Sequence, residues 1–482
     1  MNKTIRNASV FTLLLVLALL VRATWVQFYD SKALADDKLN RRNVIEQYAN
    51  PLGDIIVGGE AITGSERTKG GDLRYKRTYK DGDLYSSVTG YSSQVYGATQ
   101  LEGIYKDVLD GTDTRLKNPL DTVTNKRADP GDVVTTIDPA VQKAAYKALG
   151  DKKGAAVAVD PKSGKILGMV STPSYDPSDI SGSTDSKAWQ ALLKDEDKPL
   201  VNRALRQPLP PGSTFKLVVA AAALEDGLYG SADTRTTSPN PYTLPGTTTV
   251  LKNESASAPC EDATIRTALQ YSCNNVFAKM AVDLGQDKVK SMAEKMGFNA
   301  DKLDVPVRAA ESGYPSDMDR AQTALTGIGQ FDVTATPLQM SMVSGAIANG
   351  GELVSPHMVS QITDSNGDVL ESFDDPDSER VMSEDTANQL RSAMETVVEK
   401  GTGTNARISG ADVGGKTGTA QHGENNSKTP YAWFTSYAKG GDGKEVAVAV
   451  IVESSDAARS EVSGNGLAAP IAKAMMSAAL RS

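Results

Sequence analysis

Residues 210–224 read PPGSTFKLVVAAAAL, and they combine a forced bend with a helix that is apolar on every face. The prolines and Gly212 end one segment, and Ser213 opens the next at once. A helix that is apolar all round has to be enclosed by protein. The sequence therefore predicts a buried central helix with Ser213 and Lys216 in its first turn.

Ser213 and Lys216 together offer a nucleophile and its base. The hydroxyl of a serine at the start of a buried helix lies beside unpaired backbone N–H groups, which stabilise negative charge. Lys216 projects from the same face one turn later, and burial disfavours its charged form, so a neutral amine can act as a base. The alternative is that Ser213 is a helix N-cap, the commoner role of serine. A second S-x-x-K match, at 436–439, lies in a strand-like stretch where positions three apart face opposite ways.

Regular elements follow one another quickly after the Asp-Pro-Gly turn at 129–131. The expected order is a strand pair, a helical block, a strand meander and a terminal helix. This order indicates a mixed α/β (α+β) domain built on an antiparallel sheet. The expected strands are 133–137, 155–159, 166–170, 431–438 and 445–453, and the expected helices are 139–149, 216–225, 264–271, 276–284, 337–348, 386–398 and 467–480.

Composition and charge exclude several functional classes. The chain has 482 residues and a net charge of −9, and no basic cluster interrupts it, so nucleic acid is not an expected ligand. Its two histidines and two cysteines fall in no metal-ligand spacing, so neither a metal nor another cofactor is expected. With so few histidines, a Ser-His-Asp triad is poorly supplied as well.

The N-terminus carries an apolar run from Ala8 to Phe28, preceded by Lys3 and Arg6. As a helix this run is about 31 Å long, which is enough to cross a bilayer. We predict an uncleaved anchor with its N-terminus in the cytoplasm and the rest of the chain outside the cell membrane. The alternative is a cleaved signal peptide, whose only small-residue cleavage candidate lies at 33–35.

Residues 410–417, GADVGGKT, fit the phosphate-loop pattern G-x-x-x-x-G-K-[ST]. That loop requires an apolar strand before it and a helix directly after it. The preceding stretch, GTGTNARIS, is not a buried strand, and the residues after Thr417 do not start a helix. We therefore expect no nucleotide. Lys416–Thr419 is predicted to be an edge strand in which Gly418 lets a ligand's backbone come close.

The sequence YSCNN at 271–275 lies between two helix-like segments. The Ser272 hydroxyl and the Asn274 amide are two residues apart, and in a loop they can point into one cleft. Taken alone, the pattern S-x-N is weak, and ordinary turn chemistry is its default interpretation.

The three motifs in this order resemble the signature S-x-x-K, S-D-N and K-T-G of the penicillin-recognising serine enzymes, with Cys273 at the position where the second motif commonly has Asp. Further segments resemble the class B (monofunctional) high-molecular-weight penicillin-binding proteins, of the penicillin-binding protein A type, over nearly the whole chain. These segments are Asp132–Asp138, Val159–Gly164, Ser171–Pro177 and Asn202–Ala204 in the second part of the chain, and Tyr96–Glu102 and Leu109–Gly111 in the first.

The resemblance implies the serine penicillin-recognising transpeptidase fold, an antiparallel sheet packed with helices and joined to an all-helical subdomain. It divides the chain into a cytoplasmic tail at 1–7, an anchor at 8–28, a small, mainly β pedestal or dimerisation-like module at 29–130 and a transpeptidase domain at 131–482. The implied activity is a D,D-transpeptidase that crosslinks peptidoglycan stem peptides from a lipid-linked precursor and is acylated by β-lactams. The alternatives are a D,D-carboxypeptidase and a non-catalytic β-lactam-binding sensor or scaffold. A polytopic membrane glycosyltransferase is the implied partner.

The resemblance also assigns roles to single residues. Ser213 is the expected nucleophile, Lys216 its base and Ser272 the relay of the proton to the leaving amine. The expected substrate-binding residues are Asn274, Lys416, Thr417, Gly418 and Thr419. The expected oxyanion hole consists of the backbone N–H groups of Ser213 and Thr419.

Cys260 and Cys273 are the only cysteines, and an exported domain lies where disulfides persist. A bridge between them would close a loop of about 14 residues and brace the backbone beside Ser272. The alternative is that Cys273 is a small filler and Cys260 an independent loop residue, because spacing alone does not decide the geometry.

Overall fold

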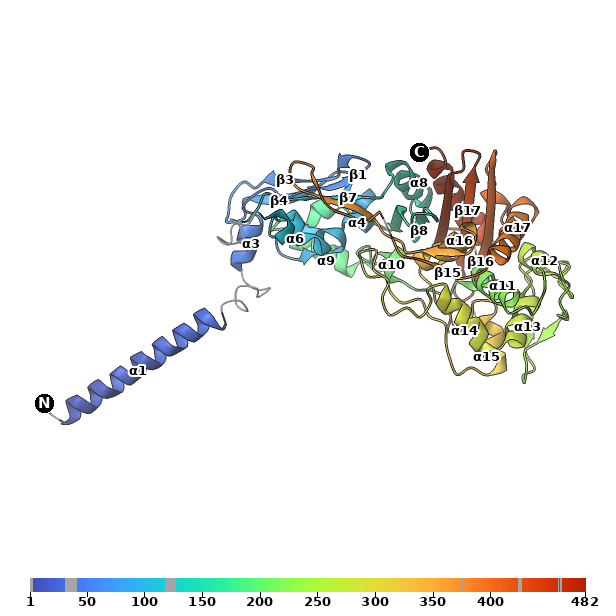
Figure 1. Ribbon diagram of the computed structural model, residues 1–482, viewed down its shortest axis with the longest axis horizontal. Helices are drawn as coiled ribbons and strands as arrows, with labels where there is room; N and C mark the ends of the chain where they lie inside the picture. The colour runs from blue at the N-terminus through green and yellow to red at the C-terminus, as the bar shows by residue number, and fades with distance from the viewer. Residues whose placement is uncertain are drawn as a thin grey trace.

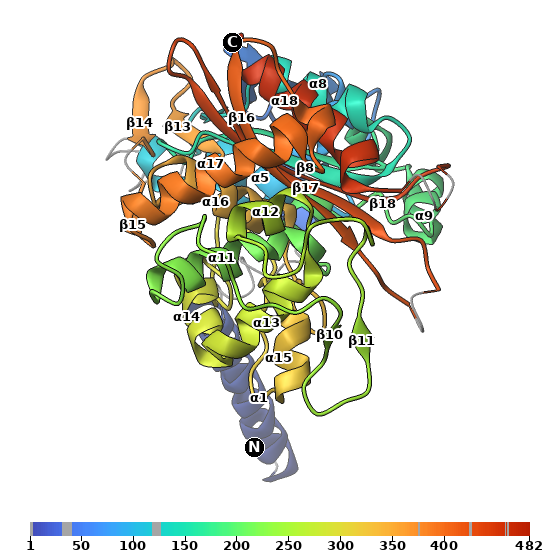
Figure 2. The same cartoon turned by 90° about the vertical axis from the view of Figure 1, so that its right-hand side faces the viewer.

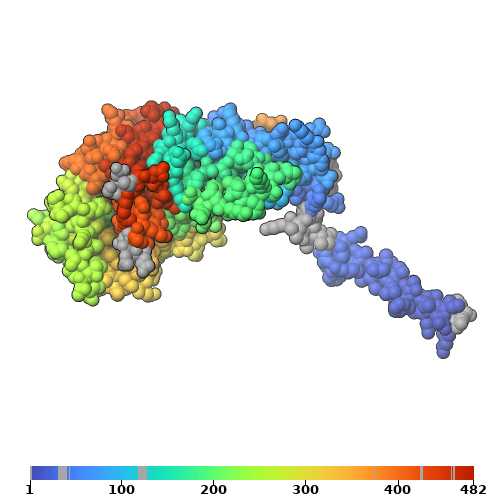
Figure 3. Space-filling view, turned by 180° about the vertical axis from the view of Figure 1, so that it is seen from behind, coloured from blue at the N-terminus to red at the C-terminus, as the bar shows by residue number. Residues whose placement is uncertain are grey.

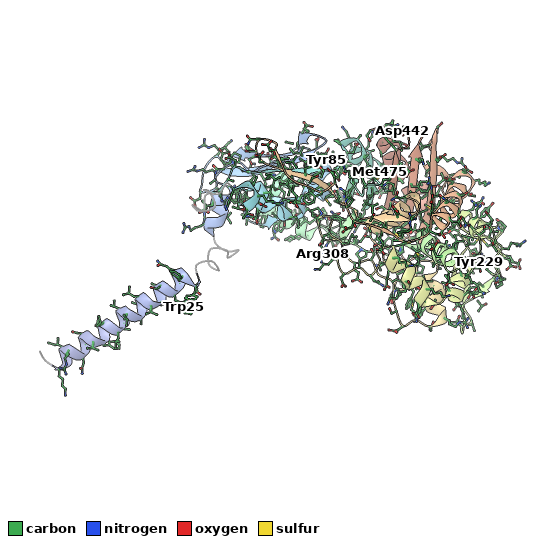
Figure 4. The ribbon with its side chains drawn as sticks, viewed as in Figure 1. Trp25, Tyr85, Tyr229, Arg308, Asp442 and Met475 are labelled. Atoms are coloured by element: carbon green, nitrogen blue, oxygen red, sulfur yellow. A yellow bond between two sulfur atoms is a disulfide. The ribbon has the colours of Figure 1, made fainter. Side chains whose placement is uncertain are left out.

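The computed structural model describes residues 3–30, 41–117, 127–374, 376–423, 427–457, 459 and 462–482. Among these residues, α1 (Lys3–Phe28) is the one helix long and apolar enough to cross a membrane. At its C-terminal end Arg22 pairs with Asp30 at 3.2 Å, and Trp25 stacks on Tyr29 where α1 comes nearest to the folded body (Figure 4). The cleavage candidate at 33–35 lies outside the described residues.

The second half of the fold is centred on a five-stranded antiparallel sheet in the order β16-β17-β18-β8-β9. The prediction that Lys416–Thr419 forms an edge strand is confirmed, because β16 pairs only with β17 among the described strands. The strands are β8 (Lys153–Val159), β9 (Ile166–Thr172), β16 (Ala411–Ala420), β17 (Tyr431–Gly440) and β18 (Glu445–Ser454).

Side chains alternate between two cores on the faces of this sheet. On β18, Val448 and Val450 belong to one core, and Ala449 and Ile451 belong to the other, as the two-residue period of a strand requires. The first core lies under α8 (Pro139–Leu149) and α18 (Ala469–Ala479), and the second under α11 (Lys216–Glu225), α16 (Pro337–Ala348) and α17 (Glu384–Lys400). Figure 2 shows the sheet between these helix layers. The predicted mixed α/β class is confirmed.

The central helix α11 is buried over nearly its whole length, as its sequence predicts. The predicted helix at 216–225 is confirmed, but the expectation that Ser213 lies in its first turn is wrong, because Gly212–Phe215 forms a separate 3-10 turn, η3, before α11. The Thr214 hydroxyl donates to the Pro211 carbonyl at 2.8 Å and closes this tighter turn. Helices α12 (Ile265–Gln270), α13 (Asn274–Leu284), α14 (Gln286–Lys295) and α15 (Arg320–Thr326) form the helical block, in which α13 and α14 pack directly on α11.

The first half of the fold is a smaller module whose sheet is completed by later parts of the chain. Its strand order is β14-β13-β7-β1-β2, with β1 (Ile55–Val57), β2 (Glu60–Ala61), β7 (Asp132–Thr135), β13 (Val359–Thr363) and β14 (Val369–Ser372). Strand β7 pairs in parallel with β1 and antiparallel with β13, so backbone pairing crosses residue 130. Figure 3 shows this module and the helical block at opposite ends of an elongated body.

The remaining elements are short and connect these layers. They are α3 (Arg41–Gln47), β3 (Thr63–Arg67), β4 (Tyr75–Tyr79), α4 (Gly82–Thr89), β5 (Ser92–Ser93), β6 (Gly97–Ala98), α5 (Gln100–Ile104), α6 (Lys106–Leu109), η1 (Thr114–Leu116), η2 (Pro177–Ile180), α9 (Ser186–Lys194), α10 (Arg203–Arg206), β10 (Tyr242–Thr243), β11 (Val250–Leu251), β12 (Glu352–Val354), β15 (Ser378–Arg380), η4 (Thr404–Ala406) and η7 (Gly464–Ala468).

Candidate active site

Ser213 lies at the wall of a cleft of about 580 Å³ between the sheet edge and the helical block. Asn274 and Thr419 line the same cleft, so one residue from each of the three sequence motifs meets there. The cap residues around this turn are Pro211 and Phe215. Ser213 is therefore not an N-cap, and its position favours the nucleophile over the capping interpretation.

The edge strand approaches the Ser213 turn closely at Gly418. A Cβ atom at this position would lie 2.9 Å from the Pro211 carbonyl oxygen and 3.0 Å from the Trp433 Cβ. Contacts that short are not tolerated, so any other residue would push β16 away from the turn. Gly418 is thus required to keep the edge strand β16 against the turn that carries Ser213.

Lys216 is fully buried, and its amine points at the S-x-N motif. Its Nζ donates to the Ser272 carbonyl oxygen at 2.8 Å and to Asn274 Oδ1 at 2.8 Å, and lies 3.2 Å from the Ser272 hydroxyl. Burial, followed by the nearby charge of Lys416, holds the pKa of Lys216 well below its ordinary value. A neutral amine keeps two N–H groups for the two carbonyl-type acceptors and leaves one lone pair to accept a proton.

The Ser272 hydroxyl is shared by two lysines. The Nζ of Lys416 lies 3.1 Å from this oxygen, opposite the contact from Lys216. Ser272 itself has a φ of 56°, in the left-handed region that non-glycine residues rarely occupy. This strained backbone turns both the carbonyl and the hydroxyl of Ser272 toward Lys216, which is consistent with a functional constraint.

Lys416 is the second fully buried lysine of the site. It also donates to the Thr417 carbonyl oxygen at 2.9 Å. Burial lowers the pKa of Lys416 to about 8, whereas the pKa of Lys216 is lowered both by burial and by the charge of Lys416. At neutral pH the geometry therefore favours a charged Lys416 beside a neutral Lys216.

The phosphate-loop match at 410–417 folds as a continuous strand. Every residue from Ala411 to Ala420 has a partner on β17, so the backbone does not curl around an anion. The first glycine inside the strand serves packing, because a Cβ on Gly414 would lie 2.3 Å from the Tyr437 ring. Gly415, the second glycine of the phosphate-loop pattern, likewise serves packing, because its Cβ would lie 2.5 Å from the Phe434 ring, whereas the first, Gly410, has nothing within 4 Å of that position.

Thr417 and the two cysteines lie near the two lysines and Ser272. The Thr417 hydroxyl hydrogen-bonds to the Thr402 hydroxyl at 2.8 Å. Cys260 and Cys273 form a disulfide with a Cα–Cα distance of 5.5 Å, and Cys273 is the residue directly before α13. In the described part of the chain no group of three or more His, Cys, Asp or Glu side chains is arranged to hold a metal ion.

The second S-x-x-K match does not contribute to the cleft. Ser436 is buried in β17 and donates to the Val448 carbonyl at 3.3 Å. Lys439 pairs with Glu445 at 3.0 Å near the turn to β18. The strand argument that separated these two residues is confirmed.

Comparison with known proteins identifies the family. Residues 154–477 match the penicillin-binding protein transpeptidase domain, and residues 52–133 match the penicillin-binding protein A dimerisation domain. The chain belongs to the penicillin-binding protein transpeptidase family. The resemblance to the penicillin-binding protein A type, drawn from the three motifs together with the further segments along the chain, is confirmed.

Relatives of this penicillin-binding protein cover its full length. It is 36% identical to the peptidoglycan D,D-transpeptidase PbpA of Mycolicibacterium smegmatis, over all of this chain and 99% of the relative, and equally identical, with the same coverage, to PbpA of Mycobacterium tuberculosis. The fold matches the ceftriaxone acyl-enzyme complex of penicillin-binding protein A from M. tuberculosis with a TM-score of 0.83 at 35% identity, covering 90% of this chain and 100% of that one.

The structure adds residues to the penicillin-binding site that the sequence motifs do not contain. Asn253 accepts the Asn274 backbone N–H at 2.6 Å through its Oδ1 and donates to Asn275 Oδ1 at 3.0 Å. Asn275 is fully buried and donates to the Cys260 carbonyl at 2.8 Å. Both brace the S-x-N loop. Asn275 could have been found from the sequence, because it directly follows the S-x-N motif. Asn253 could not, because no motif lies near it in the sequence.

Proposed function

We propose that this protein is a serine-type peptidoglycan D,D-transpeptidase that forms an acyl-enzyme on Ser213 and is acylated at the same residue by β-lactams. The observation that carries the proposal is the arrangement of Ser213 at the cleft with two buried lysines around the Ser272 hydroxyl. Relatives that are 36% identical over the full length are named D,D-transpeptidases, which supports the same reaction here.

Acylation begins with removal of the Ser213 proton. The two N–H groups of neutral Lys216 are held by the Ser272 carbonyl and Asn274 Oδ1, so its lone pair is the free part of the amine. This lone pair takes the proton while Ser213 Oγ attacks the carbonyl carbon of the penultimate D-alanine. A depressed lysine pKa suits this step, because a base works best with a pKa near the working pH.

The tetrahedral intermediate carries an oxyanion, which the backbone N–H groups of Ser213 and Thr419 stabilise. Preorganised donors of this kind commonly contribute several kcal/mol. Collapse of the intermediate breaks the peptide C–N bond, and the Ser272 hydroxyl relays a proton to the departing amine of the terminal D-alanine. Charged Lys416 lies 3.1 Å from that hydroxyl and supports the relay electrostatically, because its positive charge stabilises the Ser272 oxygen while that oxygen gives up its proton.

Substrate is held from both sides of the cleft. Asn274 uses one N–H of its amide on the Lys252 carbonyl at 2.8 Å, which leaves the other for the peptide. Lys416, Thr417 and Thr419 receive the substrate's C-terminal carboxylate, and Gly418 lets the peptide lie against β16. An amine of a second stem peptide then attacks the acyl-enzyme, forms the crosslink and frees Ser213.

The proposal also covers the membrane anchor of the protein, its domain boundaries and its partner enzyme. Helix α1 spans the cell membrane over residues 8–28, with residues 1–7 in the cytoplasm and the catalytic domain outside. The pedestal module occupies 29–130 and the transpeptidase domain 131–482, with strands β7, β13 and β14 shared at their junction. A polytopic membrane glycosyltransferase supplies the glycan strands made from lipid-linked precursor.

The deciding experiment is crosslinking by the full-length protein in detergent or bilayers, with stem-peptide donor and a separate amine acceptor. We expect a product that contains both peptides and that disappears in Ser213→Ala. Release of D-alanine without crosslinks would assign a carboxypeptidase instead. Penicillin binding without turnover of either kind would assign a sensor or scaffold.

A further inference from the structure

The end of the N-terminal module nearest to α1 carries a cluster of exposed cations. It is formed by helix α3 and by the turn of the β3–β4 hairpin. We call it the basic tip and define it as Arg41, Arg42, Arg67, Lys69 and Arg74, which are all exposed. Figure 1 shows α3, β3 and β4 at the end of the folded body that faces α1.

Two contacts hold the parts of the basic tip together. The Arg41 guanidinium donates to the Asp72 carboxylate in the hairpin turn at 3.1 Å. At the other end of α3, the Tyr75 backbone N–H donates to the Tyr48 carbonyl at 3.0 Å. The helix therefore lies along the hairpin, and its two arginines and the cations of the turn share one surface.

The charge of this surface is opposite to that of the protein. The chain has a net charge of −9, whereas residues 41–48 and 66–76 contain six Lys or Arg against three Asp or Glu. Two of those three acids are paired within the cluster, Asp72 with Arg41 at 3.1 Å and Glu66 with Lys76 at 3.5 Å. A basic surface on an acidic protein needs an anionic partner to explain it.

The position of the tip identifies that partner. Ten residues separate Asp30, at the end of α1, from Arg41, and even a fully extended segment of that length spans at most about 40 Å. Trp25 and Tyr29 stack near that end of α1, and aromatic rings of this kind favour the level of the lipid headgroups. The chain thus keeps the start of α3 within about 40 Å of the end of α1.

We propose that the basic tip docks on the anionic lipid headgroups of the bilayer that holds α1. The proposal depends on α1 being the anchor and is independent of the chemistry at Ser213. A cation close to an anionic bilayer surface is attracted to it, and each such Lys or Arg strengthens binding by roughly five-fold. Docking stands the elongated body on the bilayer and holds the cleft, which lies in the distant half of the fold, at a fixed height.

The test uses the full-length protein in nanodiscs of phosphatidylcholine, with or without phosphatidylglycerol. Both native cysteines are in the disulfide, so a cysteine introduced by Asn50→Cys, beside α3, can be labelled with a fluorescent donor. Energy transfer to a headgroup-labelled lipid reports the height of the tip. We expect transfer to rise with phosphatidylglycerol and to fall back in 0.5 M salt, because screening weakens exposed charge pairs.

The variant R67Q/K69Q/R74Q removes three tip cations for which no side-chain partner is seen among the described residues. We expect it to lower the docked-to-undocked ratio on phosphatidylglycerol about 100-fold, with penicillin acylation of Ser213 unchanged. The matched control K187Q/K194Q/K302Q also removes three positive charges, but from exposed lysines outside the basic tip, and it should dock as the wild type does. A second label from Gly441→Cys, beside Asp442 in the half of the body that lies away from α1 (Figure 4), should stay distant in every disc.

Three results would overturn the proposal. The first is equal transfer on neutral and anionic discs, and the second is an equal loss in the control variant. The third is transfer that follows an added soluble polyanion but not the lipid charge, which would assign the tip to an anionic polymer of the wall instead.

Discussion

Lys216 and Lys416, both fully buried, approach the same hydroxyl oxygen, with their Nζ atoms 3.2 Å and 3.1 Å from Ser272 Oγ. Two buried ammonium groups this close repel each other, so protonation of one disfavours protonation of the other. Burial is the main cause that lowers the pKa of Lys216, and the charge of Lys416 is a further one, whereas burial is the cause that lowers the pKa of Lys416, to about 8. The pair is thus divided into a base and a cation by its surroundings alone.

Replacing Lys416 by methionine should slow penicillin acylation about 100- to 1,000-fold, the usual effect of losing one preorganised donor. The pH dependence should change in two ways. The wild-type rate should fall above about pH 8, where Lys416 loses its proton, and the variant should lack this alkaline limb. Because the charge of Lys416 depresses the pKa of Lys216, its removal raises that pKa and moves the acid limb to higher pH.

Second-order acylation rates measured with a fluorescent penicillin between pH 5 and 10 check this prediction. Lys444→Met, in the exposed turn between β17 and β18, is the control and should keep the wild-type profile. An acid limb that stays in place in Lys416→Met would mean that the two lysines do not interact.

Ser213→Ala should abolish covalent penicillin labelling while the protein stays folded. Ser213 is nearly buried in a short turn, and removal of one hydroxyl leaves no large cavity, so the thermal unfolding temperature should change little. Intact-mass spectrometry before and after penicillin treatment measures the adduct. Ser436→Ala should label normally, and an adduct peptide that contains Ser436 would contradict the assignment.

Gly418→Ala should damage both stability and acylation, because the new Cβ would meet backbone atoms of the Ser213 turn at 2.9 Å. Overpacking of this kind costs about 1–3 kcal/mol, and moving β16 away from the turn should lower the acylation rate at least about ten-fold. Gly441→Ala adds the same methyl group where nothing lies within 4 Å. Urea unfolding of both variants measures the loss of stability, and their acylation rates measure the displacement of β16. A Gly418→Ala protein with the wild-type acylation rate would show that Gly418 is not needed to position β16.

Replacing both Cys260 and Cys273 by alanine should destabilise the protein by about 3 kcal/mol, the chain-entropy estimate for a loop of this length. Because Cys273 directly follows Ser272 and precedes α13, acylation should also slow. Thiol titration of denatured, unreduced protein should find no free cysteine. Two free thiols in natively exported protein would show that the bridge does not form.

The sequence predicts best where local chemistry decides the structure. Asp138 caps α8 through the backbone N–H groups of Ala140 and Val141, and Thr336 caps α16 ahead of Pro337, so the predicted helix starts are confirmed there. The apolar run after Lys216 likewise set the bounds of α11. Helices α9 and α14 were not predicted, because their polar sequences carry few buried side chains.

Features that join distant segments could not be predicted. The pairing of β13 with β7 links residues more than 200 positions apart, and no local pattern specifies that register. Within the site, the motifs gave the residue types, but the shared Ser272 hydroxyl and the support from Asn253 depend on where two loops meet. The left-handed backbone at Ser272 is likewise imposed by its surroundings.

The pairing of β7 and β13 also orders events in time. On the proposed topology the segments that follow α1 cross the membrane in chain order, so β1 and β2 are outside well before β13 and β14. The sheet of the N-terminal module therefore stays unfinished, with an open edge, until Ser372 has emerged. By then the Ser213 turn and the S-x-N loop are already outside, while the K-T-G strand is still to come. The pedestal is completed only shortly before the catalytic cleft closes, so the two halves mature together during export.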